Sequence, residues 1–137
     1  MRSLEFQVQE GDCADFHSID GLLVDAAVTD ANEGDWKFFR YDPKAPIRKN
    51  LHSRILKLGE YEKPNGEWNL MEVIADGETI IHKVNGKEVL RMHNPQQVVD
   101  GKNVPLTRGK IQIQSEGSEV FYRNIKVETL TKPASSY

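Results

Sequence analysis

Apolar and polar residues alternate along much of this chain, and this period of two constrains its fold more than any other feature. Leu4, Phe6 and Val8 alternate with polar residues near the N-terminus, and Ile111 and Ile113 do so near the C-terminus. Successive side chains of a strand point to opposite faces, so this pattern is typical of strands with one buried face. We find no convincing helical period, and the sequence therefore predicts an all-β chain.

Turn residues divide the chain into roughly six to eight short strands. An Asn85-Gly86 pair between two apolar runs indicates a tight hairpin, because both positions of such a turn need positive φ. The segment 48–57 fits a helix or a strand equally well, and 93–108 is expected to be a polar loop. The expected strands are 4–8, 21–28 (with a helix as the weaker alternative), 36–41, 67–75, 79–84, 88–90, 110–114 and 120–127.

Short strands with turn signals about every ten residues predict an antiparallel β-sandwich. The chain has 137 residues, enough for one compact domain and not for two. We therefore expect a single sandwich domain over residues 1–130 and a mobile tail over 131–137.

Charge and cysteine content exclude several classes of protein. The 18 basic and 21 acidic side chains give a net charge of −3, which argues against a nucleic-acid partner. A single cysteine, Cys13, excludes an intramolecular disulfide and a thiolate pair for a metal. No apolar run is long enough for a membrane span.

Two strands have unusually polar faces. Amides and carboxylates in rows suit the hydroxyls of a sugar, although a solvated sheet face gives the same pattern. These side chains are Glu5, Gln7 and Gln9 on the first strand, and Gln112, Gln114 and Glu116 on or just after a late strand.

Other candidate residues have two interpretations each. Carboxylates such as Glu5 and Glu116 suit acid–base chemistry, yet any one of the acids also fits a plain surface charge. The four histidines, among them His82, lack a metal-ligand spacing, and His82 is either a core histidine or a pocket ligand. Trp68 is either a sugar-stacking platform or a core residue. The basic cluster within 37–57 suits an anionic ligand or a solvated loop.

Four motifs, in the same order along the chain, resemble those of one family. Residues 3–12 resemble its E-x-Q strand, and residues 66–77 resemble its "GEWN" strand. Residues 80–87 are similar to its "I-x-H-x-x-N-G-K" hairpin, and residues 109–125 resemble its closing strands. The family that these motifs resemble is the 3-keto-disaccharide hydrolase domain.

This resemblance implies a concanavalin A-like or laminin-G-like jelly roll whose concave sheet faces a carbohydrate. It also implies a bacterial glycoside hydrolase acting on 3-keto-glycosides, in which a base removes the acidified C2 proton and the C1 leaving group departs by elimination before water adds back. The expected location is periplasmic, envelope-associated or secreted. A non-catalytic carbohydrate-binding module is the alternative, and the same polar face would serve it.

The resemblance also assigns residues. It places Glu5 and Glu116 in catalytic roles, with Glu5 as the favoured base or polar anchor. Substrate binding falls to Gln7, Gln9, Trp68, His82, Gln114 and Arg123. No cofactor is expected; the resemblance admits a divalent cation, and no residue pattern specifies one.

The chain departs from the family by starting at the E-x-Q strand, whereas family domains have strands before it. We therefore expect a sandwich shortened at its N-terminus, with an open sheet edge beside Glu5. An open edge favours pairing with another chain. A homo-oligomer, or a structural assembly domain that uses this edge, is thus a third expectation.

Overall fold

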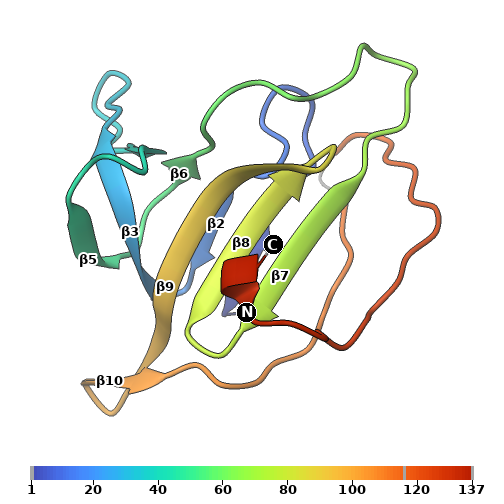
Figure 1. Cartoon of the computed structure of the whole chain (residues 1–137). Helices are drawn as coiled ribbons and strands as arrows, with labels where there is room; N and C mark the ends of the chain where they lie inside the picture. The colour runs from blue at the N-terminus through green and yellow to red at the C-terminus, as the bar shows by residue number, and fades with distance from the viewer. Residues whose placement is uncertain (1, 116, 137) are drawn as a thin grey trace.

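The fold is a β-sandwich. The computed structural model describes residues 2–115 and 117–136 and confirms the predicted all-β, jelly-roll-like fold (Figure 1). Its elements are β1 (Ser3–Phe6), β2 (Phe16–Ile19), β3 (Leu23–Asp30), β4 (Phe39–Tyr41), β5 (Ile47–Leu51), β6 (Ile55–Leu56), β7 (Met71–Asp76), β8 (Thr79–Val84), β9 (Lys87–Val99), β10 (Lys102–Pro105) and the 3₁₀ turn η1 (Ala134–Ser136).

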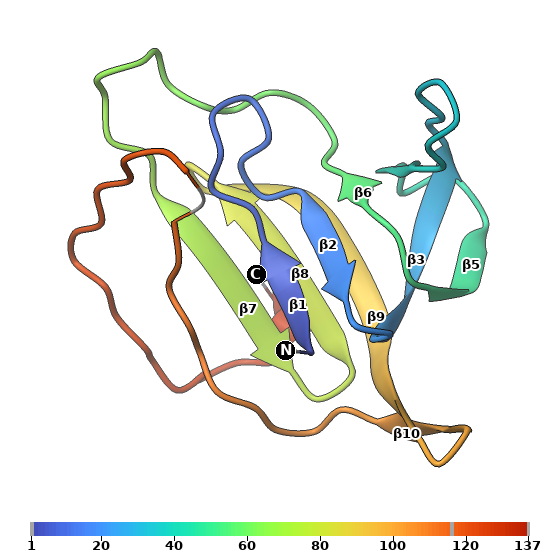
Figure 2. The ribbon, with the colours of Figure 1, turned by 180° about the vertical axis from the view of Figure 1, so that it is seen from behind.

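Two sheets share strand β3. The first sheet runs β1-β2-β6-β4-β3, and the second runs β3-β9-β8-β7 with β5 beside β3 and β10 beside β9. The second half of β3 pairs with β4, while its first half pairs with β5 and β9 across an irregularity near Asp25. All pairings are antiparallel except that of β4 with β6. Figure 2 shows β1 and β2 in front of β7, β8 and β9, and the Phe6 ring of β1 packs against His82 of β8.

The core lies between these two layers. Alternation along β8 turns Ile80, His82 and Val84 toward the first sheet, as the period of two requires. From the first sheet Phe16 and Ile55 are fully buried, and they belong to the main apolar cluster together with Val24, Ala26, Val28, Tyr41, Leu51, Ile80, Leu90 and Met92.

Turn chemistry explains both the confirmed hairpin and one missed hairpin. Asn85 and Gly86 have φ of 50° and 80° and join β8 to β9 as predicted. The polar loop predicted at 93–108 is wrong, because β9 continues to Val99 and pairs with β10. Asp100-Gly101, with φ of 49° and 72°, makes that turn and is the signal that the prediction overlooked.

The segment 48–57 is strand rather than helix, as β5 and β6 show. The helix alternative at 21–28 also gives way to strand β3. Both segments pair with neighbours far along the chain. This pairing decides the segment 48–57, where the local pattern fitted helix and strand equally, and it confirms the strand favoured at 21–28.

The two strands predicted at 110–114 and 120–127 are wrong. Among the described residues, 106–133 contain no strand, and 107–132 make no backbone–backbone hydrogen bond. The segment runs past β1 and around the β7 side of the sandwich (Figure 2). Alternation alone does not make a strand without a neighbouring backbone, and apolar side chains such as Ile111 (78% exposed) and Val127 (79%) stay at the surface.

The end of the chain returns to β7. The Ala134 amide donates to Asp76 Oδ2 over 2.8 Å, and Ala134 packs against Ile74 and Ile81 on the outer face of the second sheet. The mobility expected of residues 131–137 stays a prediction. No helix in the described part of the chain is long and apolar enough to cross a membrane.

Candidate functional site

A row of side chains crosses the outer face of the first sheet. Glu5 of β1 is paired with His17 of β2, and the pairing of Phe16 with Ile55 places His17 next to Arg54. Gln114 lies at the Glu5 end, where its Nε2 donates to Glu5 Oε2 over 3.3 Å. At the other end, the Arg54 guanidinium lies 5.6 Å from the centre of the Phe38 ring. We call these five residues the outer row.

His17 is the chemically distinctive member of the outer row. Its Nε2 is buried and has no hydrogen-bond partner among the described residues. Burial, followed by the charge of Arg54, lowers the pKa of the imidazole, against the opposing effect of Glu5. The ring is therefore neutral at pH 7, and a neutral imidazole has a nitrogen that can accept a proton.

Arg54 is held by two carboxylates. Its Nε and Nη2 donate to Asp15 Oδ2 over 3.0 and 2.6 Å, and Nη2 lies 2.8 Å from Asp12 Oδ2. Asp15 is almost completely buried and also accepts the Lys57 amide. These contacts leave Arg54 Nη1 without a hydrogen bond among the described residues, so it can donate to a ligand.

The loop that carries Asp12 and Asp15 is fixed by a buried ammonium group. Lys57 Nζ donates to the Gly11 carbonyl and lies 3.1 Å from carboxylate oxygens of both Glu60 and Glu62. Glu62 in turn accepts the amides of Gly11 and Cys13. Although burial opposes it, the Gly11 amide and Lys57 hold the pKa of Glu62 below its usual value.

A cavity of about 500 Å³ adjoins the Arg54 end of the outer row. The hairpin 31–38 forms one wall; its backbone is closed by Ala31 to Phe38 and by reciprocal bonds between Glu33 and Trp36. The volume is in the range of small-molecule sites. Its lining comprises Asp12, Asp30, Ala31, Asn32, Glu33, Phe38, Arg40, Arg54 and Leu56. Carboxylates, an amide and guanidiniums around an aromatic ring suit a polyhydroxylated ligand.

The structure brings together only some of the predicted site residues. Glu5 and Gln114 meet in the outer row. Gln7 folds back instead, and its Oε1 accepts the amides of Val8 and Gln9. Gln9 is exposed at the start of the following turn.

The remaining predicted residues lie elsewhere. His82 is a core residue, 3% exposed, with Nδ1 2.8 Å from the Ala14 carbonyl and the Phe6 ring against it. The Arg123 guanidinium lies 4.0 Å from the centre of the half-exposed Trp68 ring. Glu116 lies outside the described residues.

Sequence reasoning missed His17 and Arg54 as site residues. Phe16 and His17 are successive residues of one strand, so their side chains face opposite sides of the sheet. The outward orientation of His17 could therefore have been predicted from the sequence. That His17 lies between Glu5 and Arg54 follows from how β2 pairs with β1 and β6. The spacing of residues along one segment does not show this pairing.

Among the described residues, no three His, Cys, Asp or Glu side chains form a group able to hold a metal ion. The divalent cation that the resemblance admits stays an expectation.

Comparison with known proteins adds the family. The profile of the 3-keto-alpha-glucoside-1,2-lyase-like domain matches residues 1–128. No curated protein and no solved structure matches the chain. The match covers both β-sheets and every residue of the outer row, and so the chain belongs to the 3-keto-alpha-glucoside-1,2-lyase-like domain family.

Proposed function

We propose that this protein cleaves 3-keto-glycosides and that the outer row with its adjoining cavity is the active site. The observation that carries the proposal is the buried, unpartnered Nε2 of His17 between the Glu5 carboxylate and the Arg54 guanidinium. Family membership supports the substrate class. The periplasmic, envelope-associated or secreted location that the resemblance implies is part of this proposal.

The reaction begins at the carbon next to the ketone. His17 does not itself line the cavity and its Nε2 is buried, so the substrate has to displace the side chains that cover this atom. His17 Nε2 then takes the C2 proton, which the C3 carbonyl makes acidic, and the electron pair of that bond moves into an enolate. Arg54 Nη1 donates to the enolate oxygen at C3. A donor that is already positioned costs no reorganisation when the charge develops.

Elimination and hydration complete the cycle. The enolate expels the C1 oxygen, a double bond forms between C1 and C2, and the leaving alkoxide takes the proton held by His17. Water then adds its hydroxyl to C1 and a proton returns to C2, so that the net reaction is hydrolysis. The Glu5 carboxylate stabilises the transient imidazolium, and Gln114 positions that carboxylate.

The cavity holds the sugar. Asp30, Asn32 and Glu33 offer acceptors and donors to its hydroxyls, while the Phe38 ring offers an apolar surface to its C–H face. Arg40 extends the polar wall.

Proton exchange tests the base directly. The protein is incubated with a methyl 3-keto-α-glucoside in D₂O, and both deuterium at C2 and released 3-ketoglucose are measured. His17→Gln should reduce both by about 10²–10⁴-fold, the usual effect of losing a general base. His52→Gln, at an exposed histidine, is the matched control and should leave both unchanged. If the wild-type protein shows neither exchange nor release, the proposed activity is wrong.

A non-catalytic carbohydrate-binding module is the second candidate, because the polar cavity could hold a sugar without chemistry. Glu5→Gln distinguishes the two. Under either hypothesis, the affinity of Glu5→Gln for a glycoside, measured by calorimetry, should stay close to that of the wild-type protein. If the protein is an enzyme, the wild-type chain turns the substrate over and Glu5→Gln does so more slowly; a binding module shows no turnover in either form.

We also propose that β1 is an assembly edge. It stands at the end of the strand order and pairs only with β2 among the described residues. Exposed apolar side chains of the segment that contacts β1 through Gln114, including Ile111 and Ile113, would be covered in a homo-oligomer. Light scattering at high concentration tests this, and a strictly monomeric species would contradict it.

A further inference from the structure

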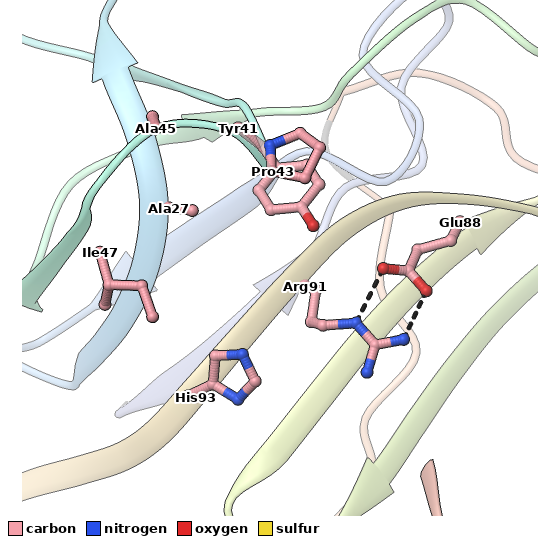
Figure 3. Close-up of a pocket in the computed structure, with 8 residues that line it drawn as sticks. All are labelled: Ala27, Tyr41, Pro43, Ala45, Ile47, Glu88, Arg91 and His93. Atoms are coloured by element: carbon pink, nitrogen blue, oxygen red, sulfur yellow. Dashed lines mark hydrogen bonds and ion pairs between the residues drawn. The ribbon is translucent and has the colours of Figure 1, made fainter. Parts of the chain in front are cut away.

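A second cavity, of about 510 Å³, lies between β9 and the turn that joins β4 to β5 (Figure 3). It shares no lining residue with the outer row or with the cavity beside it. Its lining is Ala27, Tyr41, Pro43, Ala45, Ile47, Glu88, Arg91 and His93. One wall is thus aliphatic and the other polar.

The polar wall contains an ion pair of defined geometry. Arg91 Nε and Nη2 donate to the two Glu88 carboxylate oxygens over 2.8 and 2.6 Å. The two charges cancel, while Arg91 Nη1 and the remaining lone pairs of Glu88 stay open to a ligand. A neutral ligand with hydroxyl groups therefore fits this wall better than an ion does.

Tyr41 is aimed into the same space. The residue is only 6% exposed, and its hydroxyl points toward Glu88 and Arg91 (Figure 3). That hydroxyl makes no hydrogen bond among the described residues, and it is not one of the buried unpartnered atoms there, so it stays accessible from the cavity. Burial, followed by the charge of Glu88, raises the pKa of Tyr41, so the group remains a neutral donor and acceptor.

The aliphatic wall supplies the other half of the fit. Ala27, Ala45 and Ile47 come from β3, the turn and β5, with Pro43 beside the Tyr41 ring. A pyranose has an apolar C–H face and an edge of hydroxyls, which matches an aliphatic wall facing Glu88, Arg91 and Tyr41. We propose that this cavity is a second carbohydrate-binding site, which binds a neutral pyranose unit and takes no part in the cleavage reaction.

An amide-resolved titration tests the proposal without requiring turnover. The full chain is titrated with methyl α-D-glucoside, which lacks the C3 ketone, while its ¹⁵N–¹H spectrum is recorded. The amides of Ala27, Ile47 and Arg91 should shift together and saturate. Tyr41→Phe, which removes one hydroxyl, should weaken the affinity about two- to tenfold. His17→Gln should leave these shifts unchanged.

Two further variants keep the outcome clear if Tyr41→Phe alters the packing. Glu88→Gln unbalances the ion pair, and Ile47→Lys changes a largely exposed wall position without touching the core. Both should weaken binding. The proposal is overturned if these amides do not move, if all three variants bind as the wild-type protein does, or if inorganic phosphate competes for the site. A failure of 3-keto-glycoside cleavage leaves this result untouched, because the probe is not a substrate.

Discussion

Asp15 and Arg54 form a partly buried contact, in which one Asp15 carboxylate oxygen accepts hydrogen bonds from both Nε and Nη2 of the guanidinium over 3.0 and 2.6 Å. The second oxygen of Asp15 accepts the Lys57 amide. These contacts join the loop that carries Asp15 to the first sheet, and they fix the Arg54 guanidinium in the outer row. Asp15 itself is only 2% exposed.

Asp15→Asn should lower the free energy of unfolding by about 3 kcal/mol, because it leaves a partly buried guanidinium without its main counter-charge. Urea denaturation measures the effect. Asp20→Asn is the matched control, since Asp20 faces Arg2 at 3.7 Å on the surface, and it should change stability by less than about 1 kcal/mol. Equal losses in the two variants would contradict the role given to Asp15.

Glu5→Gln should move the acid limb of the activity profile to lower pH. The Glu5 carboxylate raises the pKa of His17, although burial and Arg54 outweigh it. Without that charge the imidazole stays neutral to a lower pH, so the base remains competent there while kcat falls for lack of a counter-charge. The profile of kcat/KM against pH checks this, and a shift of the limb toward higher pH would rule out His17 as the titrating base.

His82 should make the protein acid-sensitive. Burial lowers the pKa of His82 to about 4, against the hydrogen bond to Ala14 that favours the charged form. An unfolded chain binds this proton near pH 6.5, so the stabilising contribution is complete above pH 6.5 and is lost as the pH falls to about 4. The loss is on the order of 3 kcal/mol.

Chemical denaturation at a series of pH values measures that slope. In His82→Gln the slope between these two pH values should shrink, whatever the stability of the variant at neutral pH. An unchanged slope would place the acid sensitivity elsewhere, in His17 or in the carboxylates.

Cys13 should be unreactive in the folded protein. Burial, followed by the neighbouring Glu62 carboxylate, raises the pKa of the thiol to about 12. The thiolate is the reactive form, so a disulfide reagent at pH 8 should modify the native chain far more slowly than the same chain in urea. Similar rates in the two states would show that the loop held by Lys57 opens readily.

Local chemistry made part of this fold predictable. Asn85-Gly86 specifies its hairpin through positive φ at two residues, and the alternation around Phe6 and Ile80 specifies which faces are buried. The same alternation failed at 110–114, where no neighbouring strand supplies a ladder. A strand forms only where a second segment supplies partners for its backbone hydrogen bonds, and the pattern of one segment does not show whether such a partner exists.

The candidate site was predictable to a smaller extent. Glu5 could be named because the polar row of its strand is visible along the chain, whereas Gln114 was named from a strand at 110–114 that does not form. Their neighbours His17 and Arg54 depend on the register of β2 against β1 and β6, and the Tyr41 hydroxyl depends on packing against β9. These relations join residues that are far apart in sequence, and no local pattern encodes them.

Strand β3 belongs to both sheets, and it also touches both cavities, with Ala27 lining one and Asp30 lining the other. The two residues are three apart on one strand, about 10 Å in extended chain. A ligand that changes the twist of β3 at one cavity thus acts on the wall of the other through covalent bonds. Any such communication has to be reciprocal: a sugar held at Tyr41 would alter substrate affinity beside Arg54 by the same factor that the substrate alters the affinity of that sugar.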